Sequence, residues 1–451
     1  MSRWLSLTEA HPLLRDVRQQ SALHALACFA FIAACLLAWV SLKPFPDQTL
    51  MELGELASGK EAPTYAAFGA MALLAVALAF SDNIPAFRSL ATWYFITFLV
   101  WMVLTLVWSM DFNTSIRRFA LFSCVCAVAV SMPLLPRSPA EMIRWFSIAA
   151  LIVLALCFTG VFLAGKVSIH QPTDFLESHL AGSWRGAFGH KNIAAAMMPM
   201  LVFIGIAAVR SGMVIAGPAI SVLAAVFLIG TGGKSALALC IVGLGVSAAV
   251  SAGRGLRLRA VLSLSPLLLL NLLTIGTVMN DGLDQLAALL PIDTTFTGRT
   301  DIWQFALESF AAHPLSGYGF GSFWGSRAIL DLTTAGMEWA GTASHSHNGY
   351  LDTALTLGMP GLMLLLVVLV ILPLKNFQLA GSRGNQGPLA DLFLQIWLFG
   401  IYLSALESFF FDREDPVWFT FLVATFGLHY LARFRLTESR AVPQLSSCAA
   451  T

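Results

Sequence analysis

The chain has 451 residues, of which 57% are hydrophobic and 11% charged, with a formal net charge of +1 and a mean hydropathy of +0.77. Soluble domains carry about 25% charged residues, so this composition excludes an ordinary soluble protein. It predicts an all-α polytopic membrane protein, for which we expect no nucleic-acid partner.

A helix needs about 20 apolar residues to cross a bilayer. Twelve stretches reach about that length, at about 21–42, 63–81, 89–109, 116–135, 143–164, 191–210, 213–230, 235–252, 258–279, 347–373, 388–408 and 416–433. The first stretch has no small-residue cleavage site, so we expect a retained helix and not a signal peptide. The predicted organisation is a cytoplasmic segment at 1–20, helices at 21–279, a large outer loop at 280–346, helices at 347–433 and a cytoplasmic tail at 434–451.

The distribution of charge predicts the orientation. With a cytoplasmic N-terminus, the cytoplasmic segments hold 15 of the 26 basic residues and 6 of the 25 acidic ones. The net charge is then +9 inside and −8 outside, in agreement with the positive-inside rule. An even number of spans places both termini in the cytoplasm and the loop at 280–346 outside.

The outer loop at 280–346 is too long and too rich in aromatic residues to be a simple connection. Its segment 301–312 has helical periodicity, with Ile302, Phe305, Ala306 and Phe310 on one stripe. We therefore expect a cap of short helices over the bundle.

Five polar motifs lie on the predicted outer side, at 184–192, 230–235, 297–303, 313–321 and 344–352. They bring four cations, Arg185, Lys191, Lys234 and Arg299, to a side that is otherwise net negative. Single cations at an interface are usually anchors that extend toward water. Four cations beside glycine-rich turns favour a phosphate-bearing partner, above all a lipid with a diphosphate head group.

The motif at 230–235, Gly-Thr-Gly-Gly-Lys-Ser, partly resembles a nucleotide-binding P-loop. Its flanks are spanning helices and position 228 is Leu, so we expect no nucleotide cofactor. Backbone N–H groups and a lysine at the start of a helix still favour an anion.

His347 is the candidate general base, because imidazole can accept a proton near neutral pH. A structural hydrogen bond is the simpler role, but Asn348, Tyr350 and Asp352 lie beside it. His345 is the weaker candidate because it lies further into the loop. A metal site of His345, His347 and Asp352 lacks a supporting helical spacing, so no metal is expected.

Three elements follow one another in the loop: Gly-Arg-Thr-Asp-Ile-Trp at 298–303, His-Pro-Leu-Ser-Gly-Tyr-Gly at 313–319 and His-Asn-Gly-Tyr-Leu at 347–351. At these motifs the chain resembles the O-antigen ligase and O-antigen polymerase superfamily, whose members share a Wzy-type C-terminal domain. The resemblance covers about 180–375. It implies a GT-C-type glycosyltransferase of the bacterial inner membrane, which takes a glycan from an undecaprenyl-diphosphate carrier at the periplasmic face without a nucleotide sugar or a metal.

The superfamily's ligase pattern places an Arg before the loop, an Arg early in it and a His at its end. Arg299 matches the second position and His347 the third, while Lys234 stands at the first, as in exopolysaccharide-polymerase members. The resemblance therefore implies that His347, Arg299 and Lys234 are catalytic. Further candidates for substrate binding are Arg185, His190, Lys191, Asn192, Asp301, Asn348 and Tyr350.

Two classes of function stay open at this point. The first is glycan transfer, by a polymerase that extends a glycan, which is slightly favoured, or by a ligase that attaches it to lipid A core. The second is transport of a lipid-linked glycan. Transporters tend to carry charges at mid-membrane, whereas the predicted spans here are almost free of charge, which favours an enzyme. The sequence leaves the oligomeric state open.

Reporter fusions test the predicted orientation. Alkaline phosphatase fused at Met337 and a fluorescent protein fused at Thr451 should both be active, because the first folds only outside and the second inside. A silent phosphatase fusion, together with cleavage of the loop by a cytoplasmic protease, would contradict the orientation and the active-site location with it.

Overall fold

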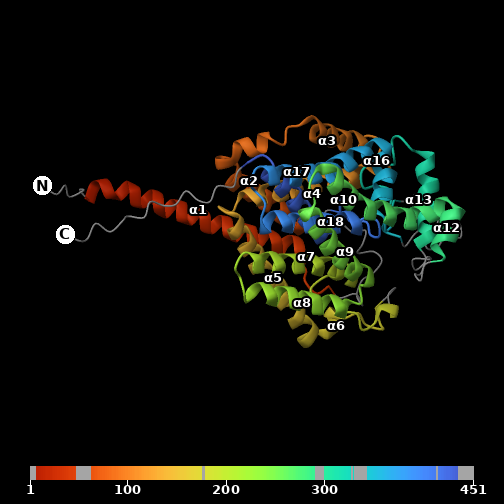
Figure 1. The fold of residues 1–451 in the computed structure, drawn as a ribbon, viewed down its shortest axis with the longest axis horizontal. Helices are drawn as coiled ribbons and strands as arrows, with labels where there is room; N and C mark the ends of the chain where they lie inside the picture. The colour runs from red at the N-terminus through yellow and green to blue at the C-terminus, as the bar shows by residue number, and fades with distance from the viewer. Residues whose placement is uncertain are drawn as a thin grey trace.

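The computed structural model describes residues 7–46, 62–174, 178–289, 299–326, 329, 343–412 and 415–434. Within these residues every regular element is a helix, and one isolated bridge pairs Ile169 with Trp184. The helices form a bundle from which α1 (Leu7–Val40) projects at one end, while α12 (Asp281–Ala287) and α13 (Arg299–Ala312) lie at the opposite end (Figure 1). We call the end with α12 and α13 the loop end.

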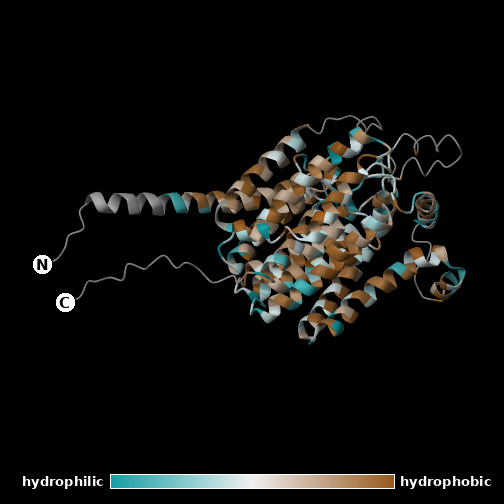
Figure 2. Ribbon diagram, turned by 90° about the horizontal axis from the view of Figure 1, so that it is seen from above, coloured by the Kyte–Doolittle hydropathy of each residue, from teal (hydrophilic) through white to brown (hydrophobic). Residues whose placement is uncertain are grey.

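Eight helical segments among the described residues are long and apolar enough to cross a membrane. They are Gln19–Val40, Ala62–Phe80, Phe112–Leu134, Pro139–Leu163, Lys191–Arg210, Lys234–Ala252, Leu256–Met279 and Gly349–Ser382. Hydrophobic residues make up most of the ribbon of the bundle (Figure 2). The chain is therefore a polytopic helical membrane protein, as predicted.

Four shorter apolar helices fall on the remaining predicted spans: α3 (Trp93–Thr105), α8 (Ala216–Thr231), α18 (Pro388–Leu403) and α19 (Pro416–Leu431). Almost every residue of α18 and α19 is buried inside the bundle. By length alone these four fall short of about 20 residues. The count of twelve spans stays a prediction.

The other long helices are α2 (Ala62–Arg88), α4 (Phe112–Ser131), α5 (Pro139–Leu163), α7 (Lys191–Arg210), α9 (Lys234–Ala252) and α10 (Leu256–Asn271).

Two predicted boundaries near the C-terminus were wrong. The helix expected to end at 373 continues from α16 (Gly349–Leu365) through a π-helix (Leu366–Ile371) into α17 (Leu372–Ser382). Pro373 lies just after this π-helix, at the start of α17.

The second wrong boundary is that of the span expected at 388–408. The helix α18 ends at Leu403, and a turn follows at 404–406. Glu407 therefore lies in the loop between α18 and α19 and not inside a membrane helix.

Contacts between α9 and α18 fix their relative depth. Ser251 Oγ donates to Asp391 Oδ1 over 3.0 Å, and Gly243 lies against Phe399. The two helices are thus antiparallel. The same register, followed to the end of α18, brings Leu239 in the second turn of α9 level with Leu403. The start of α9 and the loop after α18 accordingly lie at the same end of the bundle, the loop end.

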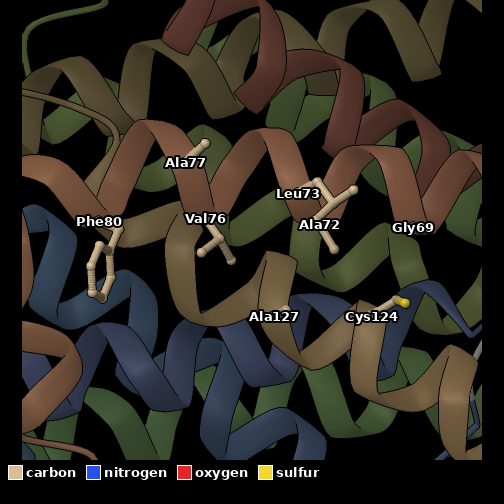
Figure 3. A pocket seen from close by; sticks show the side chains of 8 residues that line it. All are labelled: Gly69, Ala72, Leu73, Val76, Ala77, Phe80, Cys124 and Ala127. Carbon is tan, nitrogen blue, oxygen red and sulfur yellow. The ribbon is translucent and has the colours of Figure 1, made fainter.

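A shallow groove of about 700 Å³ lies between α2 and α4, lined from Gly69 to Phe80 on one side and by Cys124 and Ala127 on the other (Figure 3). Its eight lining residues carry no charge. It offers no group for phosphate binding or proton transfer, and it is a feature of the apolar surface.

A break in α16 anchors the segment that follows α13. At Gly358 the backbone has φ 69° and ψ −179°, a conformation accessible in practice to glycine alone. The segment at 313–319 bonds to the backbone groups that this break leaves without helical partners. Tyr318 N donates to Leu355 O over 3.0 Å, and Met359 N donates to Pro314 O over 2.8 Å. The break therefore holds α13 close to the start of α16.

We predict that Gly358→Ala destabilises the protein. The backbone conformation costs about 1–3 kcal/mol for a residue with a Cβ, and that atom would also collide with the carbonyl group of Leu315. The melting temperature of the purified protein in detergent measures this. Gly245→Ala is the control, because it lies within α9 with open space around it. Equal melting temperatures for the two variants would contradict the interpretation.

Candidate active site

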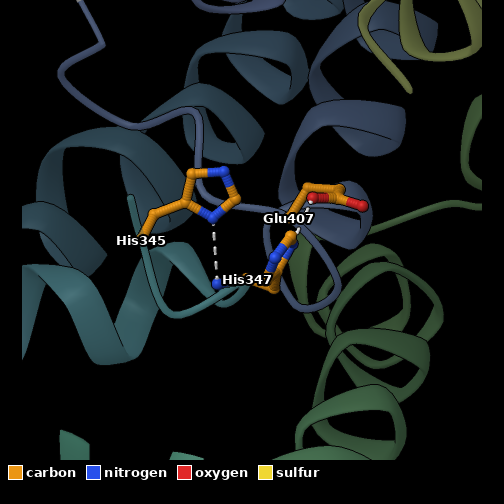
Figure 4. A group of neighbouring side chains, drawn as sticks. All are labelled: His345, His347 and Glu407. Atoms are coloured by element: carbon orange, nitrogen blue, oxygen red, sulfur yellow. Dashed lines mark hydrogen bonds and ion pairs between the residues drawn. The ribbon is translucent and has the colours of Figure 1, made fainter. Parts of the chain in front are cut away.

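The carboxylate of Glu407 joins two residues that are far from it in sequence. Arg299, at the start of α13, donates from Nη2 to Glu407 Oε1 over 2.8 Å and also donates to the Leu406 carbonyl. His347 Nδ1 lies 2.9 Å from Glu407 Oε2. Figure 4 shows His347 and Glu407 facing each other, with His345 beside them. The structure thus brings together Arg299 and His347, two of the residues predicted to be catalytic.

The charge state of Glu407 follows from these partners. Burial raises the pKa of Glu407, but the hydrogen bond from His347 and the positive charge of Arg299 outweigh it and lower the pKa to about 2. The carboxylate is therefore ionised at neutral pH and can only accept hydrogen bonds. His347 must donate from Nδ1, and in the neutral ring Nε2 is then the nitrogen that carries the lone pair.

The backbone at His347 is held in an unusual conformation, with φ 55°. Such a value is uncommon outside glycine and is maintained only where the surroundings fix it. The backbone N–H of His347 donates to His345 Nδ1 over 3.3 Å, and Trp303 Nε1 donates to the Ser346 carbonyl over 2.8 Å. The first bond lies within the histidine segment, and the second attaches that segment to α13.

Asn348 and Tyr350, both predicted to bind substrate, are bonded within the fold. Asn348 caps α16: its Oδ1 accepts from Tyr350 N over 3.1 Å, and its Nδ2 donates to the Ala405 carbonyl over 3.1 Å. Tyr350 Oη donates to the Ile401 carbonyl over 2.8 Å. Both side chains are buried, and they join the start of α16 to the end of α18. This join brings His347 to Glu407.

Three groups at this centre have the geometry to hold a metal ion. Ligand atoms of His345, His347 and Glu407 lie within 4.8 Å of one another. The predicted alternative used Asp352, but that carboxylate accepts from Trp324 Nε1 over 2.8 Å. Burial, with a smaller contribution from neighbouring His347, lowers the pKa of His345 and favours its neutral ring. Both oxygens of Glu407 already have partners, one of them the cationic Arg299, which opposes a second cation there.

Four other predicted residues, Arg185, His190, Lys191 and Asn192, gather at the start of α7. His190 caps this helix, since its Nδ1 accepts from Asn192 N over 3.0 Å. The backbone N–H of Lys191 donates to His170 Nε2 over 3.3 Å, and buried Arg185 donates to the Gly189 carbonyl over 3.3 Å. They form a second polar cluster.

Lys234 and Asp301 are both exposed. Lys234 is the first residue of α9, where Gly233 packs so closely on Ala195 that a side chain would not fit. Lys234 thus lies beside the N-terminal part of α7, at the end of the bundle that carries the loop after α18. Asp301 lies in the first turn of α13, where a negative charge suits the helix dipole.

Sequence reasoning missed Glu407. The residue was included in the predicted span 388–408, so it was treated as part of a membrane helix. One signal could have found it: an acidic residue in an apolar stretch is expensive in a membrane and usually functional. Here it lies a few residues past the end of α18.

Comparison with known proteins gave two matches. Residues 219–366 match the family model described as O-Antigen ligase. A stretch of 102 residues is 28% identical to the exopolysaccharide production protein ExoQ of Rhizobium meliloti (strain 1021). That match spans about a fifth of each protein, 21% of this chain and 22% of the relative. The family match includes Lys234, Arg299 and His347 and ends before Glu407.

Proposed function

We propose that the chain is a glycosyltransferase of the O-antigen ligase and polymerase superfamily that acts in surface polysaccharide assembly, which the family match and the ExoQ match support. Its donor is a glycan linked to undecaprenyl diphosphate, and its acceptor is a hydroxyl group of another glycan at the periplasmic face of the inner membrane. The observation that carries the proposal is the hydrogen-bonded series Arg299–Glu407–His347.

His347 is the base of this reaction. Glu407 accepts the Nδ1–H of His347 and so directs the lone pair of Nε2 outward. As Nε2 takes the proton of the acceptor hydroxyl, the ionised carboxylate stabilises the imidazolium that forms. The side chains of Arg299, His347 and Glu407 are 20%, 26% and 25% exposed, so a substrate can reach them.

Arg299 and Lys234 bind the diphosphate. The acceptor oxygen attacks the anomeric carbon, the bond from that carbon to the diphosphate oxygen breaks, and the diphosphate leaves with the electron pair. Positive groups at the leaving oxygen lower the barrier. Lys234 lies at the start of α9, a helix of 19 residues whose N-terminal dipole adds to its charge. Arg185 and Lys191, with His190 and Asn192, are candidates for further contacts with the substrates.

The reaction assembled from these groups needs neither a nucleotide nor a metal, as in a GT-C-type enzyme. We favour a polymerase over a ligase because Lys234 stands where the ligase pattern has Arg and because ExoQ is named for exopolysaccharide production. The description of the family model supports a ligase acting on lipid A core as the second candidate. The gathering of the candidate polar residues at one end of the bundle favours both over a transporter.

Replacing His347 tests the base. His347→Ala should lower the rate of transfer by about 10²–10⁴-fold and leave donor binding intact, because binding rests on the cations. His347→Gln should be equally slow, since Gln cannot accept a proton near neutral pH. The measurement is in vitro transfer by the purified protein, with His313→Ala, an exposed histidine, as the control. An active His347→Gln enzyme would leave His347 a purely structural role.

Replacing Lys234 tests the diphosphate site. Lys234→Ala should weaken donor binding and transfer by roughly 10- to 100-fold, the value of one charge-assisted contact of about 1.5–3 kcal/mol. Lys234→Arg should retain function, because the guanidinium also binds phosphate. Lys43→Ala removes another exposed lysine and serves as the control. Normal binding by Lys234→Ala would exclude this lysine from the site.

A further inference from the structure

Arg299 is expected to bind the donor diphosphate, yet it already has an anionic partner. Its guanidinium donates to Glu407 Oε1 over 2.8 Å and to the Leu406 carbonyl. A guanidinium presents the same fork of N–H groups to a carboxylate and to a phosphate. The carboxylate of Glu407 thus lies where a phosphate oxygen of the donor would bind.

We propose that Glu407 occupies the phosphate position on Arg299 while the site is empty, and that the donor diphosphate displaces it. Arg299 then exchanges the carboxylate for phosphate, and Glu407 keeps only its bond to His347. The inference rests on the proposed function, since it concerns the same site and the same donor.

The surroundings of Glu407 allow this exchange. Its other oxygen, Oε2, is held by His347 Nδ1 over 2.9 Å, so the displaced carboxylate still has a partner. Glu407 lies in the loop after α18 and not in a helix, and its side chain is 25% exposed, so an incoming phosphate can reach it. A diphosphate carries more negative charge than a carboxylate and so binds the guanidinium more strongly at the same distance.

The exchange links donor binding to the strength of the base. While Arg299 shares the charge of Glu407, the carboxylate supports the imidazolium of His347 less. Once the diphosphate takes over Arg299, the full negative charge of Glu407 acts on His347 and strengthens Nε2 as a base. The acceptor is then deprotonated most readily when a donor is present. Because the pKa of Glu407 is about 2, its carboxylate is ionised near neutral pH and competes with the diphosphate for Arg299.

Two effects of opposite sign therefore belong to one residue. Glu407 lowers the affinity for the donor and raises the rate of transfer. A side chain that only supports the fold would lower both when replaced. Glu407→Gln separates these cases, because Gln has nearly the same shape but no charge.

The test measures binding of undecaprenyl diphosphate to the purified full chain in nanodiscs, together with kcat and KM for transfer of the host's own lipid-linked glycan. Glu407→Gln should bind undecaprenyl diphosphate about tenfold tighter and turn over about 100-fold slower. The gain in binding should vanish in the double variant Arg299→Ala/Glu407→Gln. The control is Glu308→Gln, which changes an exposed glutamate on the same helix as Arg299. It should match the wild type in donor binding and in turnover.

The outcomes separate the two proposals. If the wild type binds undecaprenyl diphosphate and Glu407→Gln binds it no tighter, the exchange is wrong and the proposed function stands. If the wild type does not bind it, the proposed function is itself wrong. Melting temperatures show whether Glu407→Gln folds. Should it not, Glu407→Ala replaces it: it removes the carboxylate altogether, so tighter binding is again expected, and unchanged or weaker binding overturns the exchange.

Discussion

The bonds of the Glu407 carboxylate to Arg299 and His347 are the interaction on which the rest of the site depends. They join the start of α13, the segment before α16 and the loop after α18, three parts of the chain with no local reason to meet. A half-buried carboxylate without partners would be strongly unfavourable beside a membrane. With a guanidinium and an imidazole it is satisfied, and the three segments are fixed relative to one another.

The surrounding fold is arranged to hold those segments. Asn348 caps α16 and reaches the Ala405 carbonyl, so one side chain ties the histidine segment to the loop that carries Glu407. Trp303 fastens α13 to Ser346, and the break at Gly358 receives the segment that follows α13. The left-handed backbone at His347 is sustained by these bonds. Strain of this kind is tolerated where it fixes the direction of a functional side chain.

Much of the fold could be predicted from the sequence, because hydropathy and helical periodicity are local properties. The span at 191–210 coincides with α7, and Arg299 and His347, both singled out in the sequence, contact the same carboxylate. Glu407 was missed because the apolar pattern does not show that α18 ends at Leu403. The contacts of Asn348 and Tyr350 could not be predicted either: proximity to His347 in sequence does not tell whether a side chain faces a substrate or turns back into the bundle.

Because a buried charge needs a partner, one residue, Glu407, serves both the fold and the proposed function. If Arg299 binds the diphosphate and had no other anionic partner, its charge would be unpaired in the empty site. An unpaired charge costs several kcal/mol when it is fully buried. The carboxylate of Glu407 pairs with this charge in the empty site, and in the proposed exchange the substrate displaces it. In the proposed exchange such a residue lowers the affinity for the donor, since each donor molecule must replace it. The same carboxylate aligns His347 in the empty site and, once released from Arg299, would strengthen it as a base.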